Sequence, residues 1–166
     1  MPKGLDKGYD LFIGVAKKLS QMHAEIRYHV IGGFDENDID VKEIKDKIFF
    51  YGYKRPDWLK NFYANMDICL SPNRPYQSYK GCFGGFPIGA DLTIFGVALF
   101  ATDELNNNDN LYKDNEIVKI KCEIDDIVKK VEYYFSNPDL LYRVAENGNK
   151  KSRKLFDNKK RLEIIK

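Results

Sequence analysis

The chain has 166 residues, a length that suits one domain and leaves little room for two. Apolar residues make up 43% of the sequence and aromatic residues 14%, which predicts a packed core and excludes a disordered chain. The 27 basic and 25 acidic side chains nearly balance, so overall charge gives no argument for nucleic acid as a partner.

The first half of the chain alternates helical and extended patterns. Apolar residues at helical spacing predict helices at residues 6–22 and 55–66, the second with a proline near its start. Three short β-prone runs end at glycine or at Ser-Pro, and we expect them to form strands at residues 26–31, 48–51 and 68–70.

The second half continues the alternation after a glycine-rich stretch. We expect strands at residues 97–101 and 116–120. Helices are expected at residues 87–95, 125–135 and 137–148, the last of them ended by a glycine signal at Gly148. Beyond Gly148 the lysine-rich end of the chain favours helix but has a weaker apolar face.

This order of elements predicts an α/β fold. Strands with apolar centres that alternate with helices favour a Rossmann-like, doubly wound parallel sheet of about five strands, covered by helices on both faces. A doubly wound unit normally opens with a strand, whereas this sequence opens with a helix. We therefore expect that a first strand is missing, and that residues 1–166 are a single domain belonging to a longer protein.

The cysteines indicate the cellular compartment. Cys69, Cys82 and Cys122 are odd in number and widely spaced, and they form neither a CxxC pair nor a zinc-ligand pattern. Reduced thiols in a cytoplasmic protein are the expected state. No apolar run approaches the roughly 18 residues that a membrane-spanning helix needs.

The glycine-rich stretch KGCFGGFPIGADLTIFG, residues 80–96, is the first candidate for a binding site. If Pro87 begins a helix, Gly84 and Gly85 leave free backbone N–H groups at its start, which favours a phosphate there. Such a helix end contributes about 0.3–1 kcal/mol per anionic group, whereas micromolar affinity needs about 8 kcal/mol. A basic side chain and a base pocket must supply the rest. The glycines alone are equally compatible with a flexible connection, and no GxGxxG or Walker A pattern is present.

Several local phrases, in their order and spacing, resemble the C-terminal half of GT-B fold retaining glycosyltransferases of family 4, also called group 1. They cover nearly the whole chain. The matching segments are Lys7-Gly8, Val30-Ile31-Gly32, Ile48 to Gly52, Phe62 to Pro72, Phe83 to Pro87, and Gly96 to Asp103.

The resemblance implies a role for residues at these positions. In the family the lysine of the Lys-Gly pair contacts the donor diphosphate, which makes Lys7 the candidate here. The loop at Gly52 and Tyr53 would lie against the nucleobase, and the helix that begins at Pro87 would receive the phosphates. The donor-binding set expected from the resemblance is Lys7, Gly32, Gly33, Gly52, Tyr53, Gly84, Gly85, Phe86, Pro87 and Asp91.

The sequence also departs from the family pattern. The family has two glutamates separated by seven residues, one near the transferred sugar and one on the ribose hydroxyls. The first position corresponds to Gly84, which has no side chain, and the second to Asp91, if one residue is missing between Phe86 and Gly96. The family's arginine just upstream of the lysine has no counterpart, although Lys3 is a partial substitute. These losses put contacts with the donor sugar in doubt, and no catalytic residue is assigned.

The resemblance implies hexosyl transfer, with retention, from a UDP- or GDP-linked sugar to a glycan or lipid-linked acceptor, as in polysaccharide biosynthesis. The acceptor would be bound mainly by a missing N-terminal domain, and the isolated chain would be inactive. No metal and no cofactor are expected. The lysine-rich residues 149–166 suggest peripheral contact with the inner face of the membrane, although a solvated helix surface explains them too.

Three other functions compete with this interpretation. A non-catalytic GT-B-like binding domain is favoured by the glycine at position 84. A flavodoxin-like or receiver-type signalling module fits the length, but Asp67 stands at the start of its expected strand, whereas a receiver places its accepting aspartate at a strand end. A nucleotide-sugar epimerase would need a histidine or an acid near the sugar, and none is recognised near Pro87.

Overall fold

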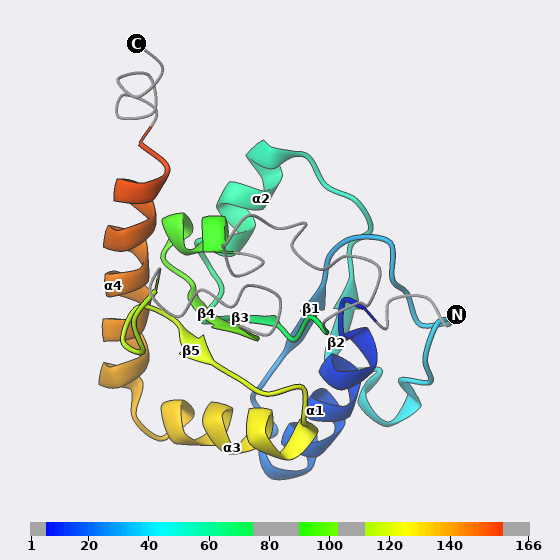
Figure 1. The fold of residues 1–166 in the computed structure, drawn as a ribbon. Coiled ribbons are helices and arrows are strands. Elements are labelled where there is room, and N and C mark those ends of the chain that lie inside the picture. Colours follow the sequence, from blue (N-terminus) through cyan, green and yellow to red (C-terminus); the bar gives the residue numbers. More distant parts are fainter. Residues whose placement is uncertain (1–5, 75–89, 103–111, 158–166) are drawn as a thin grey trace.

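The computed structural model describes residues 6–74, 90–102 and 112–157 (Figure 1). Helices and strands alternate along the chain, as the sequence predicts, with end points that differ from the expected ones by a few residues. The elements are α1 (Tyr9–Met22), β1 (Tyr28–Val30), η1 (Lys42–Ile44), β2 (Ile48–Phe50), α2 (Pro56–Tyr63), β3 (Ile68–Ser71), η3 (Ala90–Phe95), β4 (Ala98–Ala101), β5 (Val118–Lys119), α3 (Ile124–Phe135) and α4 (Pro138–Leu155).

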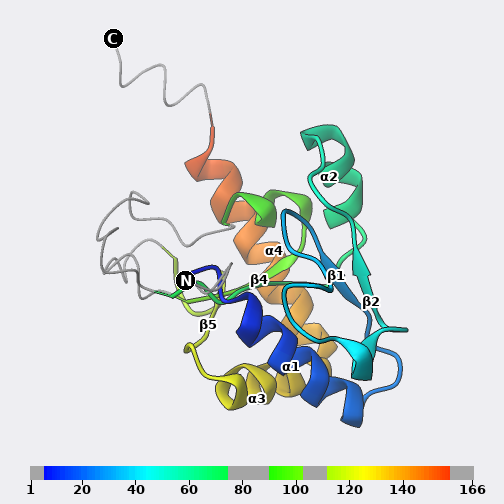
Figure 2. The same ribbon diagram turned by 90° about the vertical axis from the view of Figure 1, so that its right-hand side faces the viewer.

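All strand pairs are parallel, which confirms the predicted α/β class. Strand β1 pairs with β2, and β4 lies between β3 and β5. Helices α1 and α3 cover one side of the strands, and α2 and η3 lie on the other side (Figures 1 and 2). The difference from the expectation is that the five described strands form a two-stranded and a three-stranded sheet, rather than one continuous sheet.

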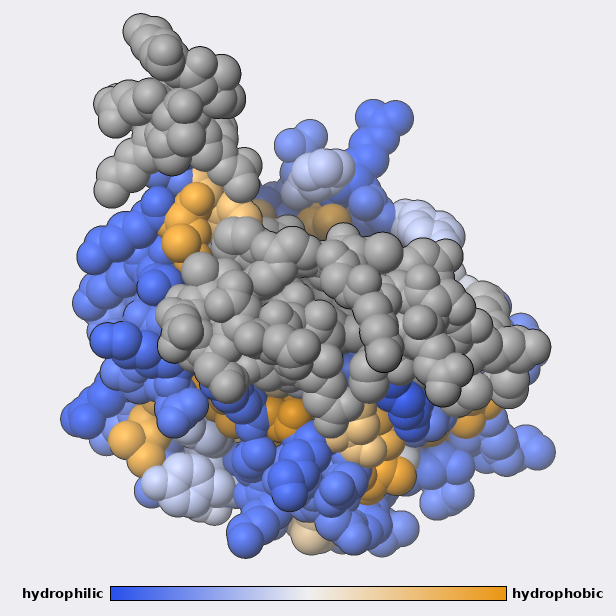
Figure 3. Space-filling model, in the orientation of Figure 1, coloured by the Kyte–Doolittle hydropathy of each residue, from blue (hydrophilic) through white to orange (hydrophobic). Residues whose placement is uncertain are grey.

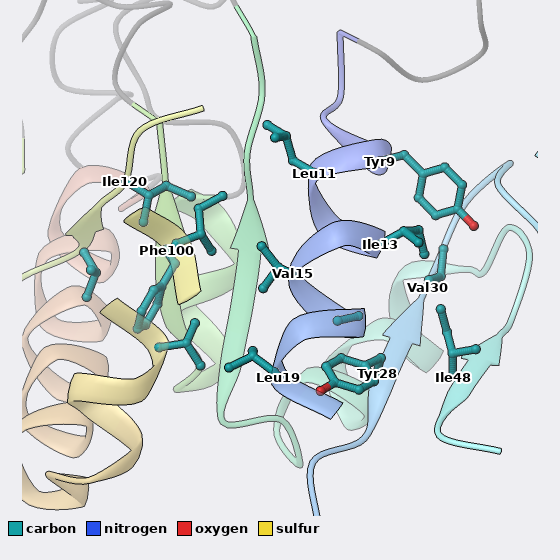
Figure 4. Close-up of a cluster of buried hydrophobic side chains, with 14 of the residues drawn as sticks. Tyr9, Leu11, Ile13, Val15, Leu19, Tyr28, Val30, Ile48, Phe100 and Ile120 are labelled. Carbon is teal, nitrogen blue, oxygen red and sulfur yellow. The ribbon is translucent and has the colours of Figure 1, made fainter. Parts of the chain in front are cut away.

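Helix α1 joins the two sheets through its buried face. In Figure 4, Leu11 and Val15 lie on the side of α1 that faces Phe100, while Tyr9 and Ile13 lie on the side that faces Val30. These residues belong to one buried hydrophobic cluster. Because apolar side chains on both flanks of one helix reach different sheets, α1 is the main packing link between them.

Helix α4 holds η3 and β4 from the outside of the sheet. The Thr93 Oγ1 atom of η3 lies 2.6 Å from Ser152 Oγ in α4, and the Tyr112 hydroxyl lies 2.9 Å from the same Ser152 oxygen. All three residues are at most 2% exposed. A buried hydroxyl is costly without a hydrogen-bond partner, so this cluster of Thr93, Tyr112 and Ser152 fixes the position of α4 along its own axis.

Gly148 does not end the last helix, contrary to the sequence prediction, because α4 continues to Leu155. A Cβ atom at Gly148 would lie 2.5 Å from the carbonyl oxygen of Glu116. The glycine therefore serves close packing of the helix against the strand-preceding turn, and the pattern that usually marks a helix end had a different cause here.

The expected helix at residues 87–95 is also different. Its described part, Ala90–Phe95, is a 3-10 helix, and residues 87–89 lie outside the described ranges. The view in Figure 3 shows a largely hydrophilic surface along α4. In the ranges that the structure describes, no helix has the length and apolar character to cross a membrane.

Candidate functional site

The carboxyl ends of the parallel strands lie at one edge of the molecule, together with the start of α1. In a doubly wound fold this edge is where ligands bind. The residues that follow β1 and β2 include Gly32, Gly33, Gly52 and Tyr53, which were predicted to contact the donor. The structure brings these four together, and Lys7 lies at the start of α1 on the same edge.

Gly8 fixes the position of Lys7. Its φ is +68°, and a Cβ atom there would lie 2.0 Å from the carbonyl oxygen of Pro72, directly after β3. Only glycine combines this backbone conformation with so close an approach. The Lys-Gly pair therefore holds the start of α1 against the carboxyl end of β3. The half-exposed Lys7 has its Nζ atom 3.8 Å from Asp6 Oδ2.

A second contact between the same elements is an ion pair that the sequence analysis did not identify. Arg74 donates two hydrogen bonds, of 2.6 and 2.7 Å, to the two carboxylate oxygens of Asp10 in the first turn of α1. The Arg74 backbone N–H also donates to the carbonyl of Asp6 at 2.9 Å. The bond to Arg74 holds the pKa of the Asp10 carboxyl below its ordinary value, against an opposing effect of burial.

Tyr9 connects the start of α1 to the loop after β1. Its ring stacks on Phe34 with centroids 4.7 Å apart, and its hydroxyl donates to the carbonyl of Asp35 at 3.0 Å. Burial, with smaller effects of the Asp38 and Asp35 charges, raises the pKa of Tyr9 to about 12. The phenol is thus neutral and structural at ordinary pH.

The two glycine loops contact each other directly. The Gly32 N–H donates to the carbonyl of Gly52 at 3.0 Å, and both residues have positive φ, +114° and +65°. A Cβ atom on Gly33 would lie 2.5 Å from the Tyr53 hydroxyl. Tyr53 is itself 86% exposed, so its ring stands over Gly33 at the surface. An exposed aromatic ring beside bare backbone is suited to stacking on a planar ligand group.

Below this edge, the loop after β3 is anchored by buried polar contacts. Asn73 is 4% exposed, and its side-chain amide donates to Ser71 Oγ at 2.6 Å. The Asn73 carbonyl accepts a hydrogen bond of 2.5 Å from Thr102 Oγ1, after β4. The loop ends near Lys7 are therefore rigidly held.

A cavity of about 720 Å³ extends from Lys7 along the gap between β1 and β3. Its walls include Tyr9, Val30 and Phe34 near the carboxyl edge, and Leu70 and Pro72 from the β3 side. Deeper in, His29 of β1 is half-buried, with Nδ1 2.9 Å from the Tyr51 hydroxyl and its ring stacked on Phe49. Burial lowers the pKa of His29, which favours the neutral imidazole.

Half of the predicted donor-binding set is not tested by these positions. Gly84, Gly85, Phe86 and Pro87 lie outside the described residues, and so does the predicted phosphate cradle. Asp91 lies in η3, where only its backbone is described. In the described part of the chain, no group of three or more His, Cys, Asp or Glu side chains is arranged to hold a metal ion.

Sequence reasoning missed Asp10 and Arg74. A bidentate pair between residues 64 positions apart leaves no local pattern in a single sequence. The signal that was available is the position of Arg74 two residues after the Ser-Pro that ends the third expected strand, where loop residues meet the start of the first helix.

Comparison with known proteins agrees with this geometry. The sequence model described as "Glycosyl transferases group 1" matches residues 4–151. The C-terminal domain of the group 1 family glycosyl transferase LpcC from Francisella tularensis is 22% identical, with a TM-score of 0.66 over 88% of this chain and 77% of that one. No curated protein matches the sequence significantly.

Two longer structures share the fold. A glycosyltransferase from Rickettsia africae is 16% identical over 96% of this chain, with a TM-score of 0.72, and the match spans 44% of its length. Anabaena Alr3699/HepE, solved in complex with UDP and glucose, is 12% identical over 96% of this chain and 45% of its own, with a TM-score of 0.69. The family match, over most of the sequence, shows that the chain belongs to the group 1 glycosyl transferases.

Proposed function

We propose that this domain binds the nucleoside-diphosphate part of a sugar donor and takes part in glycosyl transfer, with retention, to a glycan or lipid-linked acceptor. The observation that carries the proposal is the position of Lys7. Gly8 and Pro72 hold it at the carboxyl edge of the strands, beside the glycine loops and the exposed ring of Tyr53. A cation, a planar stacking surface and bare peptide groups are the parts that a nucleotide diphosphate requires.

In this proposal each group has a distinct role. The ammonium group of Lys7 balances the charge that develops on the leaving diphosphate, which is electrostatic stabilisation of the transition state. Tyr53 stacks on the nucleobase, and the backbone at Gly32 and Gly33 approaches the donor closely. Asp10 and Arg74 act by holding the start of α1 in place. UDP-bound and UDP-glucose-bound structures of HepE support a nucleotide-sugar donor for this fold.

Titration of the isotope-labelled chain with UDP and GDP, followed by amide chemical shifts, tests the proposal. We expect saturable shifts at Lys7, Gly33, Gly52 and Tyr53. Lys7→Ala should weaken the affinity about tenfold or more, because a hydrogen bond to a charged group contributes about 1.5–3 kcal/mol. The control is Lys45→Ala, an exposed lysine that precedes β2 and so lies at the amino edge.

Absence of any shift with either nucleotide at millimolar concentration would overturn the proposal. Equal weakening by Lys7→Ala and Lys45→Ala would show that only general charge attraction is involved. A chain that binds UDP but, within the intact enzyme, turns over no UDP-sugar would instead support the non-catalytic binding domain, the alternative favoured by Gly84.

A further inference from the structure

The gap between the two sheets has the form of an unfilled strand position. Among the residues that the structure describes, no backbone hydrogen bond joins β1 to β3, although the two strands face each other across the cavity of about 720 Å³. Both strands contribute to the cavity walls, β1 through Tyr28, His29 and Val30 and β3 through Ile68, Cys69 and Leu70.

The free backbone groups of both strands are directed into this gap. Tyr28 and Val30 use their N–H or C=O groups toward the β2 side, so His29 and Ile31 present theirs to the opposite side. On the other wall, Asp67 and Ser71 bond to the β4 side by the same alternation. Ile68 and Leu70 therefore present their N–H and C=O groups to the gap.

Burial tells the same story. All four residues of β4 are buried, at 1% exposure or less, because strands flank it on both sides. The four residues of β3 are all only partly buried, although Ile68 and Leu70 are as apolar as their counterparts in β4. A strand with an apolar sequence that is left partly exposed on one side indicates a neighbour that is not in place.

We propose that this gap binds an extended apolar segment of about five residues as a sixth, parallel strand, and that the segment leads directly into α1 from the amino side. The start of α1 lies against Pro72, at the carboxyl end of β3. A strand parallel to β1 and β3 would end at that same point, as a strand–helix–strand unit requires. Residues 1–5, MPKGL, contain a proline and a glycine and hold no such apolar run, so the segment lies outside the printed sequence.

The walls also define the chemistry of the segment. One face would pack on Phe12, Val15 and Ala16 of α1, and the other on Phe62 and Tyr63 of α2. Because both faces are apolar, the segment should be a continuous run of β-branched and aliphatic residues, without the polar alternation of a half-exposed strand. Once seated, it would join the two sheets into one and support Lys7 from below.

Adding the segment as a separate peptide tests this proposal. The probe is KKIVILVGK, and the matched control is the same peptide with N-methyl groups on alternate amides of the apolar run, which removes the donors along one edge. We expect saturable binding of the probe and hydrogen exchange slowed about tenfold or more at the amides of His29, Ile31, Ile68 and Leu70. The control should bind far more weakly.

A second variant guards against a peptide that merely sticks to the surface. Ile31→Pro removes an N–H directed into the gap but leaves the bonds from β1 to β2, so it should weaken the probe while the amide spectrum stays folded. Equal binding of probe and N-methylated control, or no binding by a folded chain, would overturn the proposal. Closure of the gap by a second copy of the chain, seen as a dimer in sedimentation, would overturn the assigned occupant. UDP is absent from this experiment, so its outcome is independent of the proposed function.

Discussion

The two sheets of this domain contrast in how they are held. Strand β4 has a partner on each side and an outer cover of η3 and α4, and its residues are almost fully inaccessible. Strand β1 has one partner, β2, whose Phe49 is 42% exposed, and it contacts the other sheet mainly through α1. The β3–β4–β5 sheet should therefore resist perturbation as a core, and the β1–β2 sheet should depend on a few contacts at the start and flank of α1.

The largest expected effect is in the well-covered sheet. Phe100→Ala removes a fully buried ring of β4, and we expect it to lower the free energy of unfolding by about 3–5 kcal/mol. Phe50→Ala in β2 removes the same group from a partly buried site, and about 1–2 kcal/mol is expected. Urea unfolding of both variants measures the difference. Equal losses would show that the two sheets are equally packed.

Gly8→Ala tests the contact between α1 and β3. The left-handed backbone costs a side chain about 1–2 kcal/mol, and the clash with the Pro72 carbonyl adds about 1–3 kcal/mol. Gly52→Ala is the matched control, because its φ of +65° is nearly the same and open space surrounds it. The excess loss of stability in Gly8→Ala measures the clash. If both variants unfold alike, the close approach to Pro72 has no energetic importance.

Two helical glycines separate a rigid obstacle from a flexible one. At Gly148 an added Cβ meets the backbone oxygen of Glu116, so Gly148→Ala should lose about 1–3 kcal/mol despite the better helix propensity of alanine. At Gly14 the added Cβ meets the end of the Ile124 side chain, which can move. Gly14→Ala should be nearly neutral in thermal unfolding. A greater loss at Gly14 would contradict this distinction.

The smallest expected effect is the pH dependence of the Asp10–Arg74 pair. The pKa of Asp10 is lower in the folded chain than its ordinary 3.8, so the pair stabilises the fold above that pH and loses its effect as pH falls further. Both side chains are about one-third exposed, and the loss in Asp10→Asn should be about 1 kcal/mol or less at pH 6. It should shrink at pH 3. Asp139→Asn, an exposed first-turn aspartate of α4, controls for the helix dipole.

Local patterns were sufficient to predict most elements of the fold. The glycine stops after β1 and β2, the proline at the start of α2 and the apolar runs of β3 and β4 are signals that act within a few residues. Gly148 was misread because a glycine needed for close packing and a glycine that ends a helix are identical in sequence. Only the distant Glu116 backbone distinguishes them.

The candidate site was predictable to a smaller extent. Gly32, Gly33, Gly52 and Tyr53 follow strand ends directly, so the topology of parallel strands brings them together. Arg74 was missed because its partner lies in a different element, and its role follows from three-dimensional packing. The phosphate cradle at Gly84 to Pro87 stays a prediction, since it lies outside the described residues.

The hydroxyl cluster of Thr93, Tyr112 and Ser152 has a consequence for how the domain tolerates change in α4. A slip of this helix by one turn, about 5.4 Å, would separate three alcohol groups from one another inside a dry interface. Insertions or deletions within α4 before Ser152 should therefore be selected against more strongly than the polar composition of the helix suggests. Changes after Ser152, toward the end of the helix, escape that constraint.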